Sequence, residues 1–326
     1  DATAASVKTY VSQLQGAQKR LADSVGASLD ASYQTALNGF SSTLTAAQAT
    51  KLAAHAGVKG IYPDEVLHTQ ATLGTDYLGL SGDGGVWQSI GGTADAGKGI
   101  VVGVVDTGIA PENPSFAGAP LGTTVSDTEP YLDGNDVVFT KADGGTFRSA
   151  RVDGDAGQEW SKDDYSTKLI GARYFDKGAA DAGFDFSYDY TSPRDAAGHG
   201  SHTASTAAGE NGVEATVNGI DYGKISGVAP AAKIAAYKAC YDGPDPDTQD
   251  DDICASSDLL DAIDAAVSDG VDVINFSIGG GAATTVIDAF DEAFLNAAIA
   301  GIFVSVAAGN AGPGSSTLDH AAPWYT

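Results

Sequence analysis

The chain has 326 residues, 43% of them hydrophobic, which suits one large globular domain or two unequal ones. Its net charge at neutral pH is −26, which argues against nucleic acids or anionic membranes as partners. No apolar run reaches the roughly 18 residues that a membrane-spanning helix needs. The opening Asp1-Ala-Thr-Ala4 does not resemble a signal peptide, and it fits a chain already trimmed by a signal peptidase.

Charge is distributed unevenly along the chain. Residues 1–68 carry as many basic as acidic side chains, so the whole net charge lies in residues 69–326. A neutral segment followed by a strongly acidic one indicates two domains, 1–68 and 69–326. The acidic surface fits general solubility or, alternatively, a saline or extracellular setting.

The neutral segment is expected to begin with a helix and a strand. Apolar residues recur at seven-residue spacing and predict an amphipathic helix that ends near Asp23, namely Val7, Leu14 and Leu21. The stretch 32–41, which leads to Gly39-Phe40, is predicted to be a single strand.

A second helix and strand complete the neutral segment. Thr45 is a good N-cap for a helix over 46–54, and Gln48 stands at the capping-box position. Residues 58–62 are predicted to form a strand that Pro63 stops. Together these elements predict a small α+β unit.

From about residue 99 the pattern alternates between strands and helices. Strands are predicted at 100–105, 233–238, 271–276 and 302–306. A helix is predicted at 258–268, the end of another at 294–300, and residues 200–208 are small and compatible with a helix. This alternation predicts an α/β fold with a parallel sheet covered by helices. Ligands bind beyond the carboxyl ends of such strands, and Asp106, Ser277 and Asn310 fall at or just after strand ends.

Three residues have the chemistry of acyl transfer, in which an acid orients a base and an amide holds the oxyanion. Asp106 closes an apolar strand, His199 lies between two glycines, and Asn310 follows Ala307-Ala-Gly309. Taken singly, Asp106 and Asn310 are also ordinary turn residues. Taken together, the three predict an acid, a base and an oxyanion donor.

His202 is the competitor of His199, because the two stand three residues apart and share a helical face. A His-x-x-His pair raises the alternative of a metal-dependent hydrolase. Zinc proteases of that type need four-residue spacing and a glutamate, and neither is present here. We therefore take His199 as the base and expect no catalytic metal.

Four motifs in this order resemble those of subtilisin-like serine proteases, the subtilases. They are Val105-Asp-Thr-Gly108, Gly198-His-Gly-Ser-His-Thr203, Ser277-Ile-Gly-Gly280 and Ala307-Ala-Gly-Asn310. The resemblance implies a subtilisin-like fold and a catalytic triad in the order Asp, His, Ser. It also implies that His202 is a structural histidine.

The resemblance further implies two walls of a primary specificity pocket. One wall is Ser277, Ile278, Gly279 and Gly280, and the other is Ala307, Ala308 and Gly309. Small residues leave room for a substrate side chain and expose backbone groups that pair with an extended peptide. The motifs do not say which side chain the pocket prefers.

The nucleophile of the family lies in a Gly-Thr-Ser-Met-type segment, and this chain has neither that segment nor any Met. Either the chain is a piece of a longer polypeptide, or a second chain supplies the serine, or the protein is a pseudoenzyme. We favour the first two explanations. We therefore expect residues 1–326 alone to be incomplete, inactive and unable to fold stably.

Residues 1–68 resemble the inhibitor-like, ferredoxin-like propeptide of subtilases. The resemblance is carried by Leu37-Asn-Gly-Phe40, Leu44-Thr45, Leu52 and the stretch 57–64. It implies that the propeptide tail lies in the substrate cleft. The segments Leu67-His-Thr69 and Lys168–Phe175 resemble the plant-type, cucumisin-like branch, which implies cleavage between His68 and Thr69.

Cys240 and Cys254 are the only cysteines, and 13 residues separate them. A disulfide there would stabilise the fold by about 3 kcal/mol in the chain-entropy picture. Two free buried thiols are the alternative. The aspartate-rich stretch between them is a candidate calcium loop or, more simply, a solvated loop.

These observations predict a secreted serine endopeptidase precursor that hydrolyses peptide bonds through an acyl-enzyme. Expected partners are peptide or protein substrates, the chain's own propeptide, and the remaining C-terminal part of the protease. No organic cofactor is expected, although structural calcium is common in the family. The alternative is a non-catalytic peptide-binding or inhibitory module, or a pseudoprotease.

Overall fold

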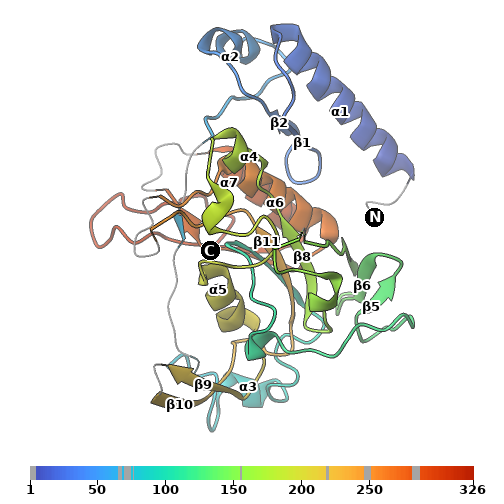
Figure 1. The fold of residues 1–326 in the computed structure, drawn as a ribbon, viewed down its shortest axis with the longest axis vertical. Coiled ribbons are helices and arrows are strands. Elements are labelled where there is room, and N and C mark those ends of the chain that lie inside the picture. The colour runs from blue at the N-terminus through green and yellow to red at the C-terminus, as the bar shows by residue number, and fades with distance from the viewer. Residues whose placement is uncertain are drawn as a thin grey trace.

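The computed structural model describes residues 5–64, 68–69, 75, 77–154, 156–217, 220–245, 251–280 and 287–326. An N-terminal unit with two helices and a short hairpin lies above a larger unit built around a sheet (Figure 1). Among the described residues, no helix has the length and apolar character needed to cross a membrane.

The larger unit contains a five-stranded parallel sheet in the order β14-β12-β4-β11-β8. Its strands are β4 (Val101–Asp106), β8 (Leu169–Tyr174), β11 (Lys233–Lys238), β12 (Val273–Phe276) and β14 (Phe303–Val306). Every residue of the central strand β4 is buried, as its unbroken apolar run predicts for a strand covered on both faces. The predicted α/β fold with a parallel sheet is confirmed.

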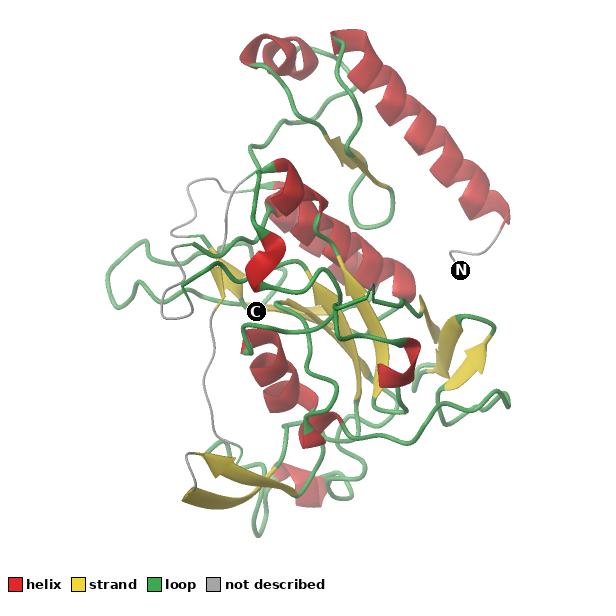
Figure 2. Ribbon diagram, viewed as in Figure 1, coloured by secondary structure: helices red, strands yellow, loops and turns green. Residues whose placement is uncertain are grey.

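Three helices cover the sheet. Helices α6 (Ser256–Asp269) and α7 (Ala289–Ile299) pack against each other above it, and α5 (His199–Ala208) lies below it (Figures 1 and 2). Leu259 and Ile263 of α6 are fully buried in the core that the sheet and the helices share. The helices thus sit on both faces and leave the strand ends accessible to loops.

The larger unit also contains several shorter helices and strands. Short helices lie at α3 (Val86–Ser89) and α4 (Lys177–Asp181), with 3-10 turns at Pro114–Phe116, Lys162–Asp164 and Phe186–Tyr188. A small antiparallel sheet contains β5 (Tyr131–Asp133), β6 (Asp136–Thr140) and β7 (Thr146–Ala150), and β9 (Val213–Val217) pairs with β10 (Ile220–Ile225).

The N-terminal unit has the predicted α+β character. It consists of α1 (Ala5–Val25), β1 (Ala31–Tyr33), β2 (Gly39–Ser41) and α2 (Ala46–Ala53). The capping box of Thr45 and Gln48 forms as predicted at the start of α2.

Two strand predictions in this unit are wrong. Residues 32–41 form a hairpin in which Tyr33 pairs with Gly39, because the intervening residues turn the chain. Residues 58–62 form no strand. There the side chain of Lys59 pairs with Glu292 of α7 at 2.9 Å, so the segment contacts a helix instead of a neighbouring strand.

The hairpin turn attaches the N-terminal unit to α6. Oδ1 of Asp264 accepts the N–H groups of Thr35 and Ala36 at 2.8 and 2.6 Å. The hydroxyl of Tyr33 donates to the carbonyl of Ser257 at 3.2 Å. One carboxylate of α6 therefore binds two backbone donors that the turn leaves without partners in the hairpin.

Candidate active site

The carboxyl ends of β4, β11, β12 and β14 lie next to one another at one side of the sheet. Phe276 at the end of β12 lies opposite Val105 of β4 and Val306 of β14, and Lys238 of β11 lies opposite Asp106. We call this side of the sheet the strand-end edge. It gathers the predicted residues that follow β4, β12 and β14, as expected for a parallel sheet.

Asp106 and His199 meet at this edge. Oδ1 of Asp106 lies 2.7 Å from Nδ1 of His199, and the two side chains are 1% and 17% exposed. The same carboxylate accepts the N–H of Thr107 at 2.8 Å and the hydroxyl of Thr203 at 3.2 Å. A carboxylate held in this way favours a proton on Nδ1, which leaves Nε2 able to accept one.

The start of α5 places His199. Gly198 adopts a left-handed conformation with φ of 86°, and His199 is the first residue of the helix. A side chain on Gly200 would collide with the carbonyl of Gly108, so this glycine lets α5 approach the turn after β4. Its N–H donates to Oγ1 of Thr107 at 2.7 Å. The close approach here is to the protein's own backbone.

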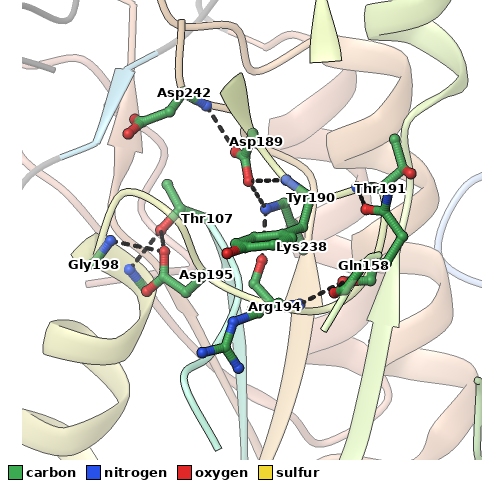
Figure 3. A network of polar contacts seen from close by, with 12 residues as sticks. Thr107, Gln158, Asp189, Tyr190, Thr191, Arg194, Asp195, Gly198, Lys238 and Asp242 are labelled. Atoms are coloured by element: carbon green, nitrogen blue, oxygen red, sulfur yellow. Dashed lines mark hydrogen bonds and ion pairs between the residues drawn. The ribbon is translucent and has the colours of Figure 1, made fainter. Parts of the chain in front are cut away.

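Asp195 holds the first turn of α5. Its Oδ1 accepts the N–H of Gly198 at 2.8 Å and the hydroxyl of Thr107 at 2.9 Å (Figure 3). Its Oδ2 accepts the N–H and the hydroxyl of Ser201 at 2.8 and 2.6 Å. A carboxylate is favourable at a helix N-terminus, where N–H groups lack helical partners. Sequence reasoning missed this role, although an Asp shortly before a helix is a capping signal.

A buried ion pair supports the segment that leads into α5. Nζ of Lys238 lies 2.6 Å from Oδ1 of Asp189 and donates to the carbonyl of Arg194 at 2.7 Å (Figure 3). Both side chains of the pair are fully buried. Burial lowers the pKa of Lys238 and raises the pKa of Asp189, and their mutual attraction opposes both shifts.

Asp189 also accepts the N–H groups of Tyr190 at 2.6 Å and Asp242 at 2.8 Å. The pair thereby ties the end of β11 to residues 189–195 and to the chain beyond β11. Sequence reasoning did not single out Lys238 or Asp189. A lysine at a strand end gives no signal of burial.

The two histidines of α5 have different surroundings. His202 is exposed on α5, whereas His199 contacts Asp106. Within the described residues, no group of three or more His, Cys, Asp or Glu side chains is arranged to hold a metal ion.

The two predicted pocket walls leave neighbouring strands. Ser277 follows β12, and β13 (Ile278–Gly279) pairs antiparallel with β3 (His68–Thr69), so that Gly279 lies opposite His68. The N–H of Ala307 donates to the carbonyl of Phe276 at 3.0 Å. The tail of the N-terminal unit thus adds a strand to one wall, which is how extended peptides bind to sheet edges.

The other residues of the two walls and Asn310 differ in exposure. Gly280 and Ala308 are exposed, and Gly309 is half-buried. Asn310 is exposed after β14, on the strand-end edge where an oxyanion donor is expected. The structure therefore puts Asp106 and His199 in direct contact and leaves Asn310 open to solvent.

Cys240 and Cys254 form a disulfide with a Cα–Cα distance of 4.2 Å. It links the residues that follow β11 to the segment before α6. Of the aspartates in this loop, Asp247 and Asp250 lie outside the described residues. Asp251 and Asp252 accept backbone N–H groups of the same loop, which supports the solvated-loop alternative.

Comparison with known proteins decides the family. A family model described as the subtilase family matches residues 97–326, and one described as peptidase inhibitor I9 matches residues 1–70. The chain belongs to the subtilase family. The predicted resemblance, including the inhibitor-like N-terminal unit, is confirmed.

The subtilase is similar to plant proteins over most of its length. It is 38% identical over 300 residues to the subtilisin-like protease SBT1.6 of Arabidopsis thaliana, a match covering 90% of this chain and 35% of the relative. It is 37% identical over 307 residues to SBT2.5 of the same plant, covering 90% and 33%. The chain thus spans about a third of the length of these relatives.

Solved structures are more distant. Fervidolysin from Fervidobacterium pennivorans, a keratinolytic enzyme related to subtilisin, is 18% identical with a TM-score of 0.48, over 94% of this chain and 39% of its own. The epidermin leader peptide processing serine protease of Staphylococcus aureus is 16% identical with a TM-score of 0.46, over 90% and 57%.

Proposed function

We propose that this chain is the N-terminal part of a secreted subtilisin-like serine endopeptidase precursor. Residues 1–68 are the propeptide, and residues 69–326 are the first part of the catalytic domain. The observation that carries the proposal is the 2.7 Å contact between Asp106 and His199 at the strand-end edge of a subtilase.

In the proposed reaction, Nε2 of His199 takes the proton of a serine hydroxyl as that oxygen attacks the peptide carbonyl. Asp106 keeps the proton on Nδ1 and stabilises the imidazolium that forms. His199 then gives the proton to the leaving amine, and water later hydrolyses the acyl-enzyme by the same route. The side-chain amide of Asn310 donates to the oxyanion, a contribution worth about 2.7–4 kcal/mol in subtilisin itself.

The serine is supplied by sequence or by a chain outside residues 1–326. The length of the plant relatives, about three times that of this chain, supports this part of the proposal. Residues 1–326 alone are proposed to be inactive.

The propeptide tail is proposed to block the cleft until it is cut between His68 and Thr69. The pairing of β3 with β13 supports this, because a substrate peptide would use the same backbone groups. Secretion is supported by the disulfide, since such bonds persist in oxidising compartments.

The test is peptide hydrolysis by the protein joined to the sequence that carries its serine. Replacing His199 by Ala should lower kcat by about 10⁶-fold, the loss known from subtilisin. The matched control is His202→Ala on the same helix, which should retain far more activity. Absence of hydrolysis by the unchanged protein would favour the alternative, a module that binds peptides without cutting them. Equal hydrolysis by His199→Ala and the unchanged protein would contradict the role of His199 as the base.

A further inference from the structure

The two proposed pocket walls are fixed against each other at their base. They begin after the neighbouring strands β12 and β14, and the N–H of Ala307 donates to the carbonyl of Phe276 at 3.0 Å. Both walls contain glycine, at Gly279 and Gly309. The size and polarity of the space between the walls therefore depend on the side chain that faces these two glycines.

That side chain is Asp319. A methyl group placed on Gly309 would lie 2.6 Å from its Oδ1, and one placed on Gly279 would collide with its Oδ2. One carboxylate thus contacts both walls, in space that any side chain at either glycine would fill. The absence of a side chain at both glycines leaves room for this carboxylate.

The backbone around Asp319 is anchored to both walls. Its own N–H donates to the carbonyl of Ala308 at 3.2 Å. Nε2 of His320 donates to the carbonyl of Ile278 at 2.8 Å, and the ring packs edge-on against Phe276. The carboxylate is therefore held in place by its neighbours and not by a surface loop alone.

Asp319 differs from three buried carboxylates of the larger unit that each contact a basic side chain. Asp106 contacts His199, Asp189 contacts Lys238, and Asp269 contacts Arg173. Within the described residues, no Lys, Arg or His forms an ion pair with Asp319, and no hydrogen bond to its carboxylate is present. A half-buried carboxylate between apolar walls is stabilised when a cation joins it.

We propose that Asp319 determines the specificity of the primary pocket, by binding a lysine or arginine that immediately precedes the scissile bond of a peptide substrate. This inference rests on the proposed function, since it assigns a substrate class to that same cleft. The ammonium or guanidinium group of the substrate supplies the charge that Asp319 lacks, while the aliphatic stem lies along Gly279, Ala308 and Gly309.

The test uses the protein joined to the sequence that carries its serine, and peptides that differ only in the residue before the scissile bond. The readout is the ratio of kcat/KM for the Arg peptide to that for the Leu peptide. We expect a ratio of at least about tenfold, since close charge pairs are worth more than a factor of ten. Asp319→Asn should bring the ratio close to one, and Asp319→Lys should favour a Glu peptide.

Asp127→Asn is the matched control, because it removes the same charge from an exposed loop before β5. It should leave the ratio unchanged. A ratio near one in the unchanged protein, or an unchanged ratio in Asp319→Asn, would overturn the inference. If Asp319→Asn does not fold, Asp319→Ser removes the same charge and is judged by the same ratio.

The outcomes that would contradict the proposed function differ from those that would contradict the role of Asp319. If no peptide is cut, the protease assignment is wrong and the inference falls with it. If His199→Ala cuts as well as the unchanged protein, the proposed catalytic role of His199 is wrong. If the Leu peptide is cut in a His199-dependent manner but Arg and Lys bring no advantage, only the role of Asp319 is wrong.

Discussion

Buried carboxylates organise two regions of the molecule, the strand-end edge and the face of α6 beneath the N-terminal unit, but with opposite surroundings. At the strand-end edge, Asp106 and Asp189 each lie within 2.7 Å of a basic side chain. On α6, the carboxylates lie beside one another instead. The first arrangement pairs each carboxylate with a basic side chain, and the second places carboxylates together where burial raises their pKa.

The carboxylates on this face of α6 are Asp258, Asp261 and Asp264. Burial, reinforced by neighbouring carboxylates, raises the pKa of Asp258 and of Asp261 to about 7, and burial raises that of Asp264 as well. Asp264 also binds the hairpin turn of the N-terminal unit. The N-terminal unit is thus attached to α6 through a carboxylate whose pKa is raised by burial.

The largest effect is expected from a substitution at the strand-end edge, where Asp106 contacts His199. Asp106→Asn keeps the shape of the side chain but favours the wrong tautomer of His199, so kcat for peptide hydrolysis should fall by about 10⁴-fold. Asp127→Asn, which removes an exposed charge, is the control. A loss of less than about tenfold would mean that the contact with His199 does not orient a base.

The buried ion pair should affect stability strongly. Lys238→Met leaves the carboxylate of Asp189 buried without its cation, which should cost about 3–5 kcal/mol in the free energy of unfolding. Adding Asp189→Leu should recover only part of this loss, because Asp189 also accepts two N–H groups. Urea denaturation measures both, and a Lys238→Met protein as stable as the original would contradict this account.

A smaller effect is expected at the N-terminal unit. Asp264→Ala removes the acceptor of the N–H groups of Thr35 and Ala36, which should cost about 1–3 kcal/mol locally. Hydrogen exchange at these two amides should become at least about fivefold faster. Exchange in β4 serves as the internal control, since it should not change. Unchanged exchange at Thr35 would show that the turn is held by other contacts.

The smallest expected effect is on the pH dependence of Tm. Because the pKa of Asp261 is raised in the folded state, its burial favours folding at acidic pH, and this contribution is lost as pH rises from about 4 towards 7. Asp261→Asn should therefore raise Tm at pH 8 and leave it nearly unchanged at pH 4. The exposed variant Asp163→Asn should change neither value. A lower Tm at pH 8 in Asp261→Asn would contradict the sign of this linkage.

Sequence patterns predict the strand-end edge better than the contacts that support it. Asp106 and His199 can be found because an apolar run ends at one and glycines flank the other. Lys238 also ends an apolar strand, but its partner Asp189 lies 49 residues away in a polar stretch. No local pattern reveals that this distant aspartate is buried.

The N-terminal unit shows why short strands are difficult. The pattern over 32–41 is compatible with one strand, yet the chain turns within it because Asp264 of α6 binds the turn. That contact comes from residues far along the chain. Asp319 is similar, since its position between two glycines depends on a long connection after β14 and not on its neighbours in sequence.

The most direct test of the central claim is labelling of the protein, joined to its serine-bearing sequence, with a fluorophosphonate probe. The protein should acquire one covalent label on a serine, and His199→Ala should lose it while His202→Ala keeps it. Absence of labelling in the unchanged protein, or equal labelling in His199→Ala, would contradict the assignment of Asp106 and His199 to a serine protease triad.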